Sequence, residues 1–356
     1  MLVSVVLPTF NRAKQLARAL DSVLAQTYGQ FEVLVVDDGS TDETSGVIEG
    51  RYHDEPRVVY LRQEHAGVAR ARNTALERAR GEVIAFLDSD DEWRPWKLAF
   101  QLECLQRTPE AGMVWTDMDA VDAAGNLMPE CSLRDILSAF RRFPLSYLFD
   151  QQIALEDVAS TPPSLRTRSL YVGDVFGKMV IGNLVLPSSA LVTRERLDRV
   201  GRFDESLSVS GEDFDFFLRI CREGPVAFAD VPSTRKQLGQ SDQLTHPSRT
   251  LDLARNYLRT MNGALERDPD RVDLPPKIVR AARADGHAWT GRAYLEVGDR
   301  ASARRHLRQA MRLRPLDAKT LVAAGLALLP AAISARALGS LAGVKTAVGR
   351  LSSRRG

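Results

Sequence analysis

The stretch that decides the fold reads Val83-Ile84-Ala85-Phe86-Leu87-Asp88-Ser89-Asp90-Asp91. An apolar run of this length, bounded upstream by Gly81, is typical of a buried parallel strand. Because open α/β sheets bind ligands beyond the carboxyl ends of their strands, the acids predict a binding site at that edge. The carboxylates repel one another unless a cation lies among them, and Mg or Mn with oxygen ligands would supply that charge. The alternative is a solvated acidic turn.

Strand–helix units precede this stretch and predict a doubly wound sheet. Apolar runs at 3–7, 31–36 and 58–61 read as strands, and 67–79 reads as a helix dense in arginine. Asn11 is expected to cap the helix that follows the first strand. The polar tips of the strands should meet at one edge, where a nucleotide would bind. No GxGxxG or GxxxxGK[ST] sequence occurs at a strand–helix junction, which disfavours a dinucleotide fingerprint or a P-loop.

The middle of the chain is less regular. We expect a helix at 93–107 and a strand at 113–116, and residues 130–180 read as an irregular segment with Pro162-Pro163. A long segment of this kind inside a compact domain is more often a functional loop than a linker. Further on, Phe214 and the apolar residues after it have helical spacing, which places Glu212 and Asp213 in the first turn, where the helix dipole stabilises anions.

Composition is that of a soluble globular protein, but charge is unevenly distributed. Residues 249–356 hold 21 basic and 9 acidic residues, whereas residues 1–248 hold 27 basic and 37 acidic ones. An acidic body with a basic tail suggests two tasks. The three cysteines form no CxxC or CxxH motif, which favours a reducing compartment over a disulfide framework or a zinc site. With no leader and no apolar run of membrane length, a cytoplasmic location is expected.

Taken together, these motifs resemble a family 2 inverting glycosyltransferase of the GT-A fold. The resemblance runs from Ser4 to about Arg235, about two-thirds of the chain. Six stretches carry it in the family's order and spacing: Leu7-Pro8-Thr9-Phe10-Asn11-Arg12, Val35-Val36-Asp37-Asp38-Gly39-Ser40-Thr41-Asp42, Ala69-Arg70-Ala71-Arg72-Asn73, Gly81 to Asp91, Gly201-Arg202-Phe203-Asp204 and Gly211-Glu212-Asp213. It implies an α/β fold with a GT-A transferase domain over residues 1–240 and a segment facing the acceptor over residues 130–185.

The resemblance also implies a nucleotide-sugar donor, most simply a UDP-sugar. Thr9 and Asp38 match positions that hold the base and ribose, with Asn11 and Asp37 beside them. Arg72 matches a basic residue near the base or the phosphates. Since Arg70 and Arg72 lie on one helix, one of the two must point away from the site.

The resemblance assigns the acids at the strand tip to the DxD motif. Asp88 would reach the ribose, and Asp90 would hold Mg or Mn on the diphosphate. Asp213 matches the catalytic base, which takes the proton of the acceptor hydroxyl as it attacks the anomeric carbon. A single displacement of this kind inverts the anomeric configuration. Glu212, beside it, is expected to act as a helix cap.

The chain departs from the family pattern after the base. Residues 233–241 read STRKQLGQS, so the usual histidine position is Gln237 or Leu238. Arg235 and Lys236 supply charge there, and His246 lies further on. The third metal or phosphate ligand therefore has no clear candidate.

The tail from 249 to 356 is predicted to be helical throughout. Gly291, Tyr294 and the small residues after them fit one tetratricopeptide-like hairpin at 283–316, for which an ordinary helix hairpin is the alternative. Residues 300–356 carry 12 basic residues and one acid, and the segment past Thr320 is rich in apolar and small residues. That composition suits peripheral contact with an anionic membrane, and a solvated terminal helix is the alternative.

The sequence thus predicts a metal-dependent hexosyltransferase for a glycan or lipid-linked acceptor, as in bacterial surface polysaccharide synthesis. Nucleic acid is not an expected partner. A nucleotidyltransferase is a rival, but residues 8–14 lack the glycine-rich loop it would need. A non-catalytic scaffold built on a degenerate transferase domain is a second rival, which intact Asp88, Asp90 and Asp213 disfavour.

Overall fold

The computed structural model of the chain describes residues 1–122, 126–128, 132–158, 161–207, 210–238 and 249–329. Contacts divide the chain into two compact units. The first is Met1–His246 with Asp268–Val272, and the second is Pro247–Arg267 with Asp273–Gly356. No helix in the described ranges is long and apolar enough to cross a membrane.

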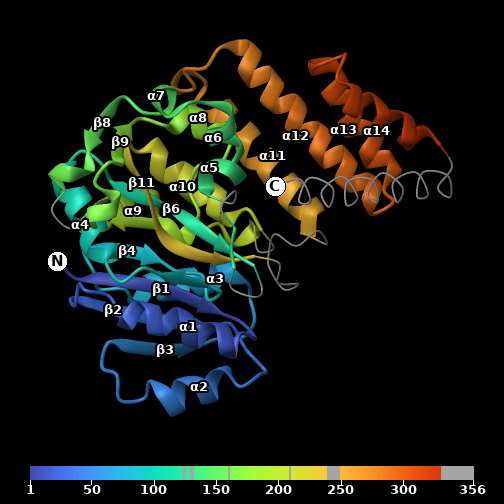
Figure 1. The fold of residues 1–356 in the computed structure, drawn as a ribbon. Coiled ribbons are helices and arrows are strands. Elements are labelled where there is room, and N and C mark those ends of the chain that lie inside the picture. The colour runs from blue at the N-terminus through green and yellow to red at the C-terminus, as the bar shows by residue number, and fades with distance from the viewer. Residues whose placement is uncertain (123–125, 129–131, 159–160, 208–209, 239–248, 330–356) are drawn as a thin grey trace. The chain divides into compact units, whose positions relative to one another are not determined.

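A mixed sheet forms the centre of the first unit (Figure 1). Its main path runs β3-β2-β1-β4-β10-β6-β11-β9-β8, with β5 paired to β11 and β7 paired to β6. Strands β3, β2, β1 and β4 are mutually parallel, β10 is antiparallel to both of its neighbours, and β6 is parallel to β11. The strands are β1 (Val3–Thr9), β2 (Phe31–Asp37), β3 (Val58–Arg62), β4 (Val83–Phe86), β5 (Asp91–Trp93), β6 (Met113–Val121), β7 (Leu127–Met128), β8 (Gln151–Ala154), β9 (Ser169–Gly173), β10 (Ala190–Thr193) and β11 (Val226–Gln237).

Helices connect the strands of the first unit and cover the sheet. The α-helices are α1 (Ala13–Leu24), α2 (Thr44–Arg51), α3 (Val68–Arg78), α4 (Lys97–Arg107), α5 (Leu133–Ile136), α6 (Ser138–Arg142), α7 (Leu145–Leu148), α8 (Phe176–Val180), α9 (Arg194–Val200) and α10 (Glu212–Arg222). Short 3-10 turns are η1 (Leu155–Asp157), η2 (Pro163–Leu165), η3 (Pro187–Ser189), η4 (Glu205–Leu207) and η6 (Pro269–Arg271).

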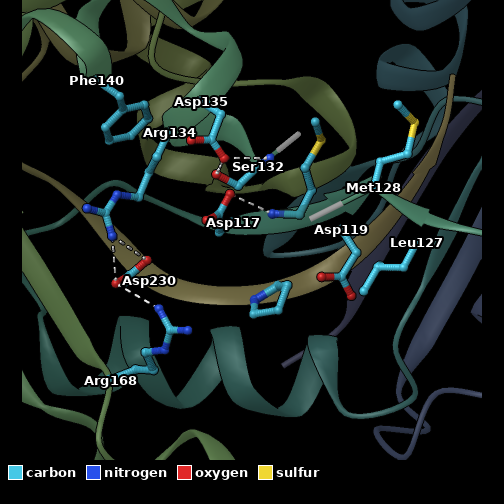
Figure 2. Close-up of a pocket in the computed structure, with 12 residues that line it drawn as sticks. Asp117, Asp119, Leu127, Met128, Ser132, Arg134, Asp135, Phe140, Arg168 and Asp230 are labelled. Atoms are coloured by element: carbon cyan, nitrogen blue, oxygen red, sulfur yellow. Dashed lines mark hydrogen bonds and ion pairs between the residues drawn. The ribbon is translucent and has the colours of Figure 1, made fainter. Parts of the chain in front are cut away.

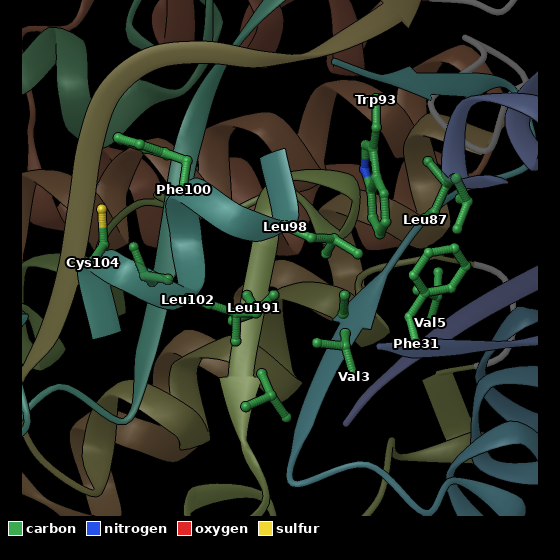
Figure 3. Close-up of a cluster of buried hydrophobic side chains, with 14 of the residues drawn as sticks. Val3, Val5, Phe31, Leu87, Trp93, Leu98, Phe100, Leu102, Cys104 and Leu191 are labelled. Atoms are coloured by element: carbon green, nitrogen blue, oxygen red, sulfur yellow. The ribbon is translucent and has the colours of Figure 1, made fainter. Parts of the chain in front are cut away.

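Alternate residues of the central strands point to two separate apolar layers. Val3 and Val5 of β1 belong to one layer, with Leu87 beyond β4 and with Leu98 and Leu102 of α4 (Figure 3). On β4, Phe86 belongs to the other layer, where its ring meets Phe203, Phe216 and Phe217 edge to face. Burial on both faces explains why these strands read as continuous apolar runs in the sequence.

The described part of the second unit is helical, as the sequence predicts. It contains α11 (Thr250–Arg267), α12 (Pro276–Glu296), α13 (Arg300–Leu313) and α14 (Ala318–Leu328). Leu295, Leu307 and Ala323 form part of its core. A Cβ atom added at Gly291 would lie 2.7 Å from Leu307 Cγ, so this glycine lets α12 and α13 approach closely.

Three expectations about local structure were wrong. Asn11 does not cap α1: it has φ 52° and its Oδ1 accepts from the amide of Thr41 at 2.7 Å. Glu212 does not cap α10, because Gly211 is the N-cap and no side chain caps it. Residues 130–180 are not merely irregular, since the described part contains β8 and β9 of the main sheet.

Candidate functional site

The acids of the strand tip lie where the sequence predicts, in the turn that follows β4. The turn is closed by a hydrogen bond from the Asp91 amide to the Asp88 carbonyl at 3.0 Å. The Asp88 amide donates to Ser188 Oγ in η3 at 3.0 Å. The carbonyl of Ser188 also accepts from Trp93 Nε1 at 2.8 Å and from Thr234 Oγ1 at 3.0 Å. One serine therefore joins the end of β4 to β5 and β11.

Each acid of the turn pairs with a basic residue from a distant segment. Arg72 Nη2 lies 2.8 Å from Asp88 Oδ1 and Arg12 Nη1 lies 3.0 Å from Asp90 Oδ1. Lys236 Nζ lies 3.3 Å from Asp91 Oδ1. The segments that carry these cations are thus held at the same edge of the sheet, as their motifs predict.

Arg72 joins the strand tip to the start of α10. Its side chain is 3% exposed, and its Nη1 donates to Glu212 Oε1 at 2.6 Å while Nη2 donates to Asp88. The guanidinium also lies over the Phe203 ring, 5.3 Å from the centroid. Arg70, on the same helix, is exposed and pairs with Glu205 at 3.3 Å. The expectation that one of the two arginines points away from the site is therefore confirmed.

Asp213 follows Glu212 in the first turn of α10, so the structure brings it into the same cluster as Asp88. Burial raises the pKa of Asp213 to about 7, and Glu212 adds to the rise while Arg72 opposes it. For Asp88, burial favours a higher pKa, but Arg72, Lys236 and Arg12 outweigh it and hold the pKa below its usual value. Two carboxyl groups of one cluster thus differ in proton affinity, which is typical of acid–base sites.

Asp91 is buried beside two other acids. Burial raises its pKa to about 7, Lys236 opposes the rise, and Asp90 and Asp88 add to it. No cluster of three or more His, Cys, Asp or Glu side chains with metal-site geometry occurs among the described residues. A Mg-type ion nevertheless fits the donor set, since such ions take one or two carboxylates and complete their shell with water and substrate phosphates.

The residues predicted to bind the donor lie at the ends of β1 and β2. Thr9 is buried, and no described group hydrogen-bonds to its Oγ1. Asp37 accepts from the Ser40 amide at 2.7 Å and from Tyr60 Oη at 2.6 Å. Thr9 therefore has a buried hydroxyl without a partner among the described residues, whereas the contacts of Asp37 shape the loop after β2.

Asp38 holds the loop that leads into α3. Its oxygens accept from Gln63 Nε2 at 2.7 Å and from the amides of Ala66 and Gly67 at 2.9 and 2.8 Å, and His65 Nδ1 lies 2.9 Å away. The His65 ring stacks on Phe10, with centroids 4.1 Å apart. Sequence reasoning missed this aromatic pair, although Phe10 lies inside one of the quoted motifs.

A cavity of about 440 Å³ opens beside the C-terminal half of β6 and the middle of β11 (Figure 2). Asp117 and Asp119 of β6, Asp230 of β11 and Arg134 of α5 line it. Asp230 lies 3.3 Å from Arg134 and 3.4 Å from Arg168, and both arginines converge on it from opposite sides. Sequence reasoning pointed to segment 130–185 here but to none of the β6 residues.

The departure from the family pattern lies at the end of β11. Gln237 is its last residue, and its Oε1 accepts from Arg18 Nη2 at 2.5 Å. The Leu238 amide donates to the Val121 carbonyl at 2.9 Å. Neither residue is placed as a metal ligand by these contacts. His246 lies outside the described residues.

Comparison with known proteins identifies the N-terminal segment. The family model described as Glycosyl transferase family 2 matches residues 4–156. This chain contains a glycosyltransferase family 2 domain. The matched range includes the β4 acids and Arg72, whereas Asp213 lies beyond it.

Relatives of the family 2 domain act in bacteria. Over 106 residues the chain is 44% identical to "UDP-Glc:alpha-D-GlcNAc-diphosphoundecaprenol beta-1,3-glucosyltransferase WfgD" of Escherichia coli, covering 29% of this chain and 41% of that protein. The chain spans less than half the length of the curated relatives it matches.

Two solved structures share the fold of the family 2 domain and the helices after it. One is Staphylococcus aureus TarS 1–349 in complex with UDP-GlcNAc, with a TM-score of 0.59 and 17% identity over 92% of this chain and 90% of that one. The other is the mannosyltransferase PcManGT from Pyrobaculum calidifontis with GDP-Man and Mn2+, with a TM-score of 0.53 and 21% identity over 96% and 79%. The predicted GT-A fold with a helical C-terminal region is thus confirmed.

Proposed function

We propose that this protein transfers one sugar from a nucleoside diphosphate sugar to a hydroxyl group of a glycan or lipid-linked acceptor, with inversion at the anomeric carbon. The observation that carries the proposal is the Arg72 bridge. It joins Asp88, at the tip of β4, to Glu212, beside Asp213 on α10. Residues more than a hundred positions apart thereby form one polar centre inside a glycosyltransferase fold.

A UDP-sugar is the donor that we favour. WfgD is named for UDP-Glc, and TarS was solved with UDP-GlcNAc. In this chain the stacked rings of Phe10 and His65 offer an aromatic surface for a base, directly after Thr9, whose buried hydroxyl has no partner among the described residues. Asp88 would meet the ribose. Asn11, Asp37 and Asp38 would act through the loops that they hold in place.

A divalent cation, Mg or Mn, would sit at Asp90, with Asp88 beside it. When bound, it would stabilise the charge of the departing diphosphate as a Lewis acid. The basic side chains of the protein would also stabilise the negative charge of the diphosphate, since Arg12, Arg72 and Lys236 surround the turn. In addition, their pairs with the three acids hold the turn in place before the donor arrives.

Asp213 would be the general base. A carboxylate whose pKa is near 7 is about half ionised at neutral pH, and its ionised form can remove a proton from the acceptor hydroxyl. Only one base is needed, because the diphosphate leaves without protonation by the enzyme. Attack on the face opposite the diphosphate gives the inverted product.

An assay of donor binding and turnover tests the proposal. A panel of nucleotide sugars with Mn would be screened by thermal shift, because a bound donor stabilises the protein by mass action. Turnover of the best donor would then be measured for Asp213→Asn. We expect a loss of at least about 10²-fold with donor binding retained.

Asp215→Asn is the matched control, because Asp215 lies on the same helix but pairs with Arg219 at 2.9 Å. It should keep turnover close to that of the wild type. Full turnover by Asp213→Asn would remove Asp213 from the mechanism. If no nucleotide sugar binds or is consumed, the scaffold alternative would replace the proposal.

The composition of the basic tail suggests a binding partner, a membrane surface. We propose that the C-terminal region contacts an anionic membrane surface, where lipid-linked acceptors lie. On described residues, Leu321, Val322 and Leu328 of α14 are exposed apolar side chains that follow the arginine-rich helix α13. Apolar side chains combined with basic ones are typical of interfacial helices.

A further inference from the structure

The cavity at β6 and β11 belongs to the same edge of the sheet as the acids after β4. Strand β10 lies between β4 and β6 and is antiparallel to both, so β4 and β6 run in the same direction. Ser188 connects the turn after β4 to β11, because its Oγ accepts from the Asp88 amide and its carbonyl accepts from Thr234 Oγ1. Thr234 is in register with Met118, which lines the cavity. A molecule in this cavity would therefore lie beside the proposed reaction centre.

The charge of the cavity wall argues against an anionic occupant. Four carboxylates line it, from Asp117, Asp119, Asp135 and Asp230, against the guanidinium groups of the two wall arginines, Arg134 and Arg168. Arg94, outside the lining, pairs with Asp119 at 2.6 Å, which leaves one negative charge in excess. Both wall arginines are already directed at Asp230 (Figure 2). A phosphate or a uronic acid would thus meet net negative charge, whereas the hydroxyl groups of an uncharged sugar would meet acceptors.

Asp117 is the acceptor best placed for such hydroxyl groups. It is 7% exposed, and its Oδ1 accepts from the amides of Met118 at 2.8 Å and Leu133 at 2.7 Å. No described residue donates to its other oxygen. This oxygen is not among the fully buried, unpaired side-chain atoms of the described residues, so it is open to the cavity, where a ligand hydroxyl can donate to it.

The rest of the wall suits the apolar face of a sugar ring. Phe140, Met118 and Leu127 line the cavity. Phe140 is fixed by its ring contact with Phe228, whose centroid is 5.0 Å away. Small-molecule sites combine an apolar lining with a few placed polar groups in just this way, and their volumes of roughly 300–1,000 Å³ include the value found here.

We propose that this cavity binds the terminal, uncharged sugar of the acceptor, with Asp117 accepting hydrogen bonds from its hydroxyl groups. The inference rests on the proposed glycosyltransferase function and adds the acceptor's chemical class and place. The nucleotide sugar is expected at Asp88 and Asp213, because Arg72 bridges Asp88 to Glu212, the neighbour of Asp213. The cavity beside them is therefore left for the acceptor.

Asp117→Asn tests the proposal with little disturbance of the fold, since asparagine keeps the oxygen that accepts from both amides. We expect the KM for an uncharged glycoside acceptor to rise about tenfold or more, as loss of a hydrogen bond to a charged group implies. Donor KM and donor hydrolysis should stay within about twofold of the wild type. Asp157→Asn, at an exposed carboxylate of η1 outside the cavity lining, is the matched control and should change neither constant.

A second variant keeps the test decisive if Asp117→Asn does not fold. Leu127 lines the cavity and is 57% exposed, so Leu127→Arg requires no new burial. Its guanidinium would pair with the cavity carboxylates and exclude a sugar. The acceptor KM should again rise while the donor KM is retained.

Binding without turnover separates this inference from the proposed function. Ligand-observed NMR with uncharged methyl hexosides, methyl N-acetylhexosaminides and methyl uronides would be run on the wild type and on Asp117→Asn. Uncharged glycosides should bind the wild type and lose binding in the variant. Preference for uronides, an unchanged acceptor KM or an altered donor KM would overturn the inference. Sugar binding without turnover of any nucleotide sugar would instead overturn the function.

Discussion

At the scale of single residues, the cluster around Arg72 shows how burial sets chemical roles. The same guanidinium that holds the pKa of Asp88 low opposes the rise in the pKa of Asp213 but does not cancel it. Asp88 therefore stays ionised, as a ligand for a ribose or a metal must. Asp213, beside another carboxylate, becomes a group that titrates near neutral pH.

The pH dependence of turnover follows from Asp213. Because its folded-state pKa is raised to about 7, the carboxyl group is protonated and inactive as a base below that value. We expect kcat/KM to fall about tenfold per pH unit below pH 7 and to level off above it. A pH–rate profile between pH 5 and pH 9 measures this. A flat profile across that range would contradict the assignment.

The stability of the fold should depend on Arg72 more than on any surface arginine. Arg72→Lys keeps the charge but cannot donate to Asp88 and Glu212 in the same bridging geometry. Breaking a buried pair of this kind costs about 3–5 kcal/mol of unfolding free energy. Arg70→Lys, at an exposed pair, should cost less than about 1 kcal/mol. Urea denaturation measures the unfolding free energy of both variants. Equal losses for Arg72→Lys and Arg70→Lys would argue against a stabilising role of the Arg72 bridge.

At the scale of elements, the strands at 3–7, 31–36 and 58–61 are confirmed. The first two are buried on both faces, so they need an apolar side chain at nearly every position, whereas the third is a partly exposed edge strand. Strands β5, β8 and β9 were not predicted. Their residues are mixed in polarity, and their strand state depends on pairing with distant partners.

The residues of the candidate site also divide into those that could be predicted from the sequence and those that could not. Motif residues such as Asp88 and Arg72 could be found from the sequence, and so could their meeting at one edge. Ser188 and Asp117 could not, since a serine in a short turn and an acid within a strand have no spacing signature. Arg12 was visible only as the last residue of a quoted motif. Its pairing with Asp90 depends on how the loop after β1 folds.

Two glycines in helices of the second unit should respond oppositely to alanine. At Gly291 the new Cβ would lie 2.7 Å from Leu307 Cγ and 3.3 Å from the Ala303 carbonyl, so Gly291→Ala should destabilise by about 1–3 kcal/mol. Gly325 of α14 has nothing within 4 Å, so Gly325→Ala should stabilise by up to about 1 kcal/mol through helix propensity. Thermal denaturation measures both. Equal shifts would show that α12 and α13 are not in close contact.

At the scale of the whole molecule, the opposite charges of the two halves give a test of membrane contact. Anionic surfaces attract each nearby basic residue by about 1 kcal/mol, and salt screens that attraction. The full chain should therefore bind phosphatidylglycerol vesicles, release them at high salt, and ignore phosphatidylcholine vesicles. A chain ending at Thr320 should bind more weakly in a flotation assay. Equal binding of the two chains would refute the role of the tail.

The single arginine between the tip of β4 and the start of α10 has a further consequence for dynamics. Since both of its carboxylate partners come from the protein itself, the reaction centre is assembled before any substrate arrives. The two sides of the centre cannot separate without leaving the buried charges of Arg72 and Glu212 unpaired. The Asp215 amide of α10, which donates to the Gly211 carbonyl at 3.2 Å, should accordingly exchange with deuterated water slowly in the ligand-free protein, at a rate set by global unfolding and not by local opening of a loop.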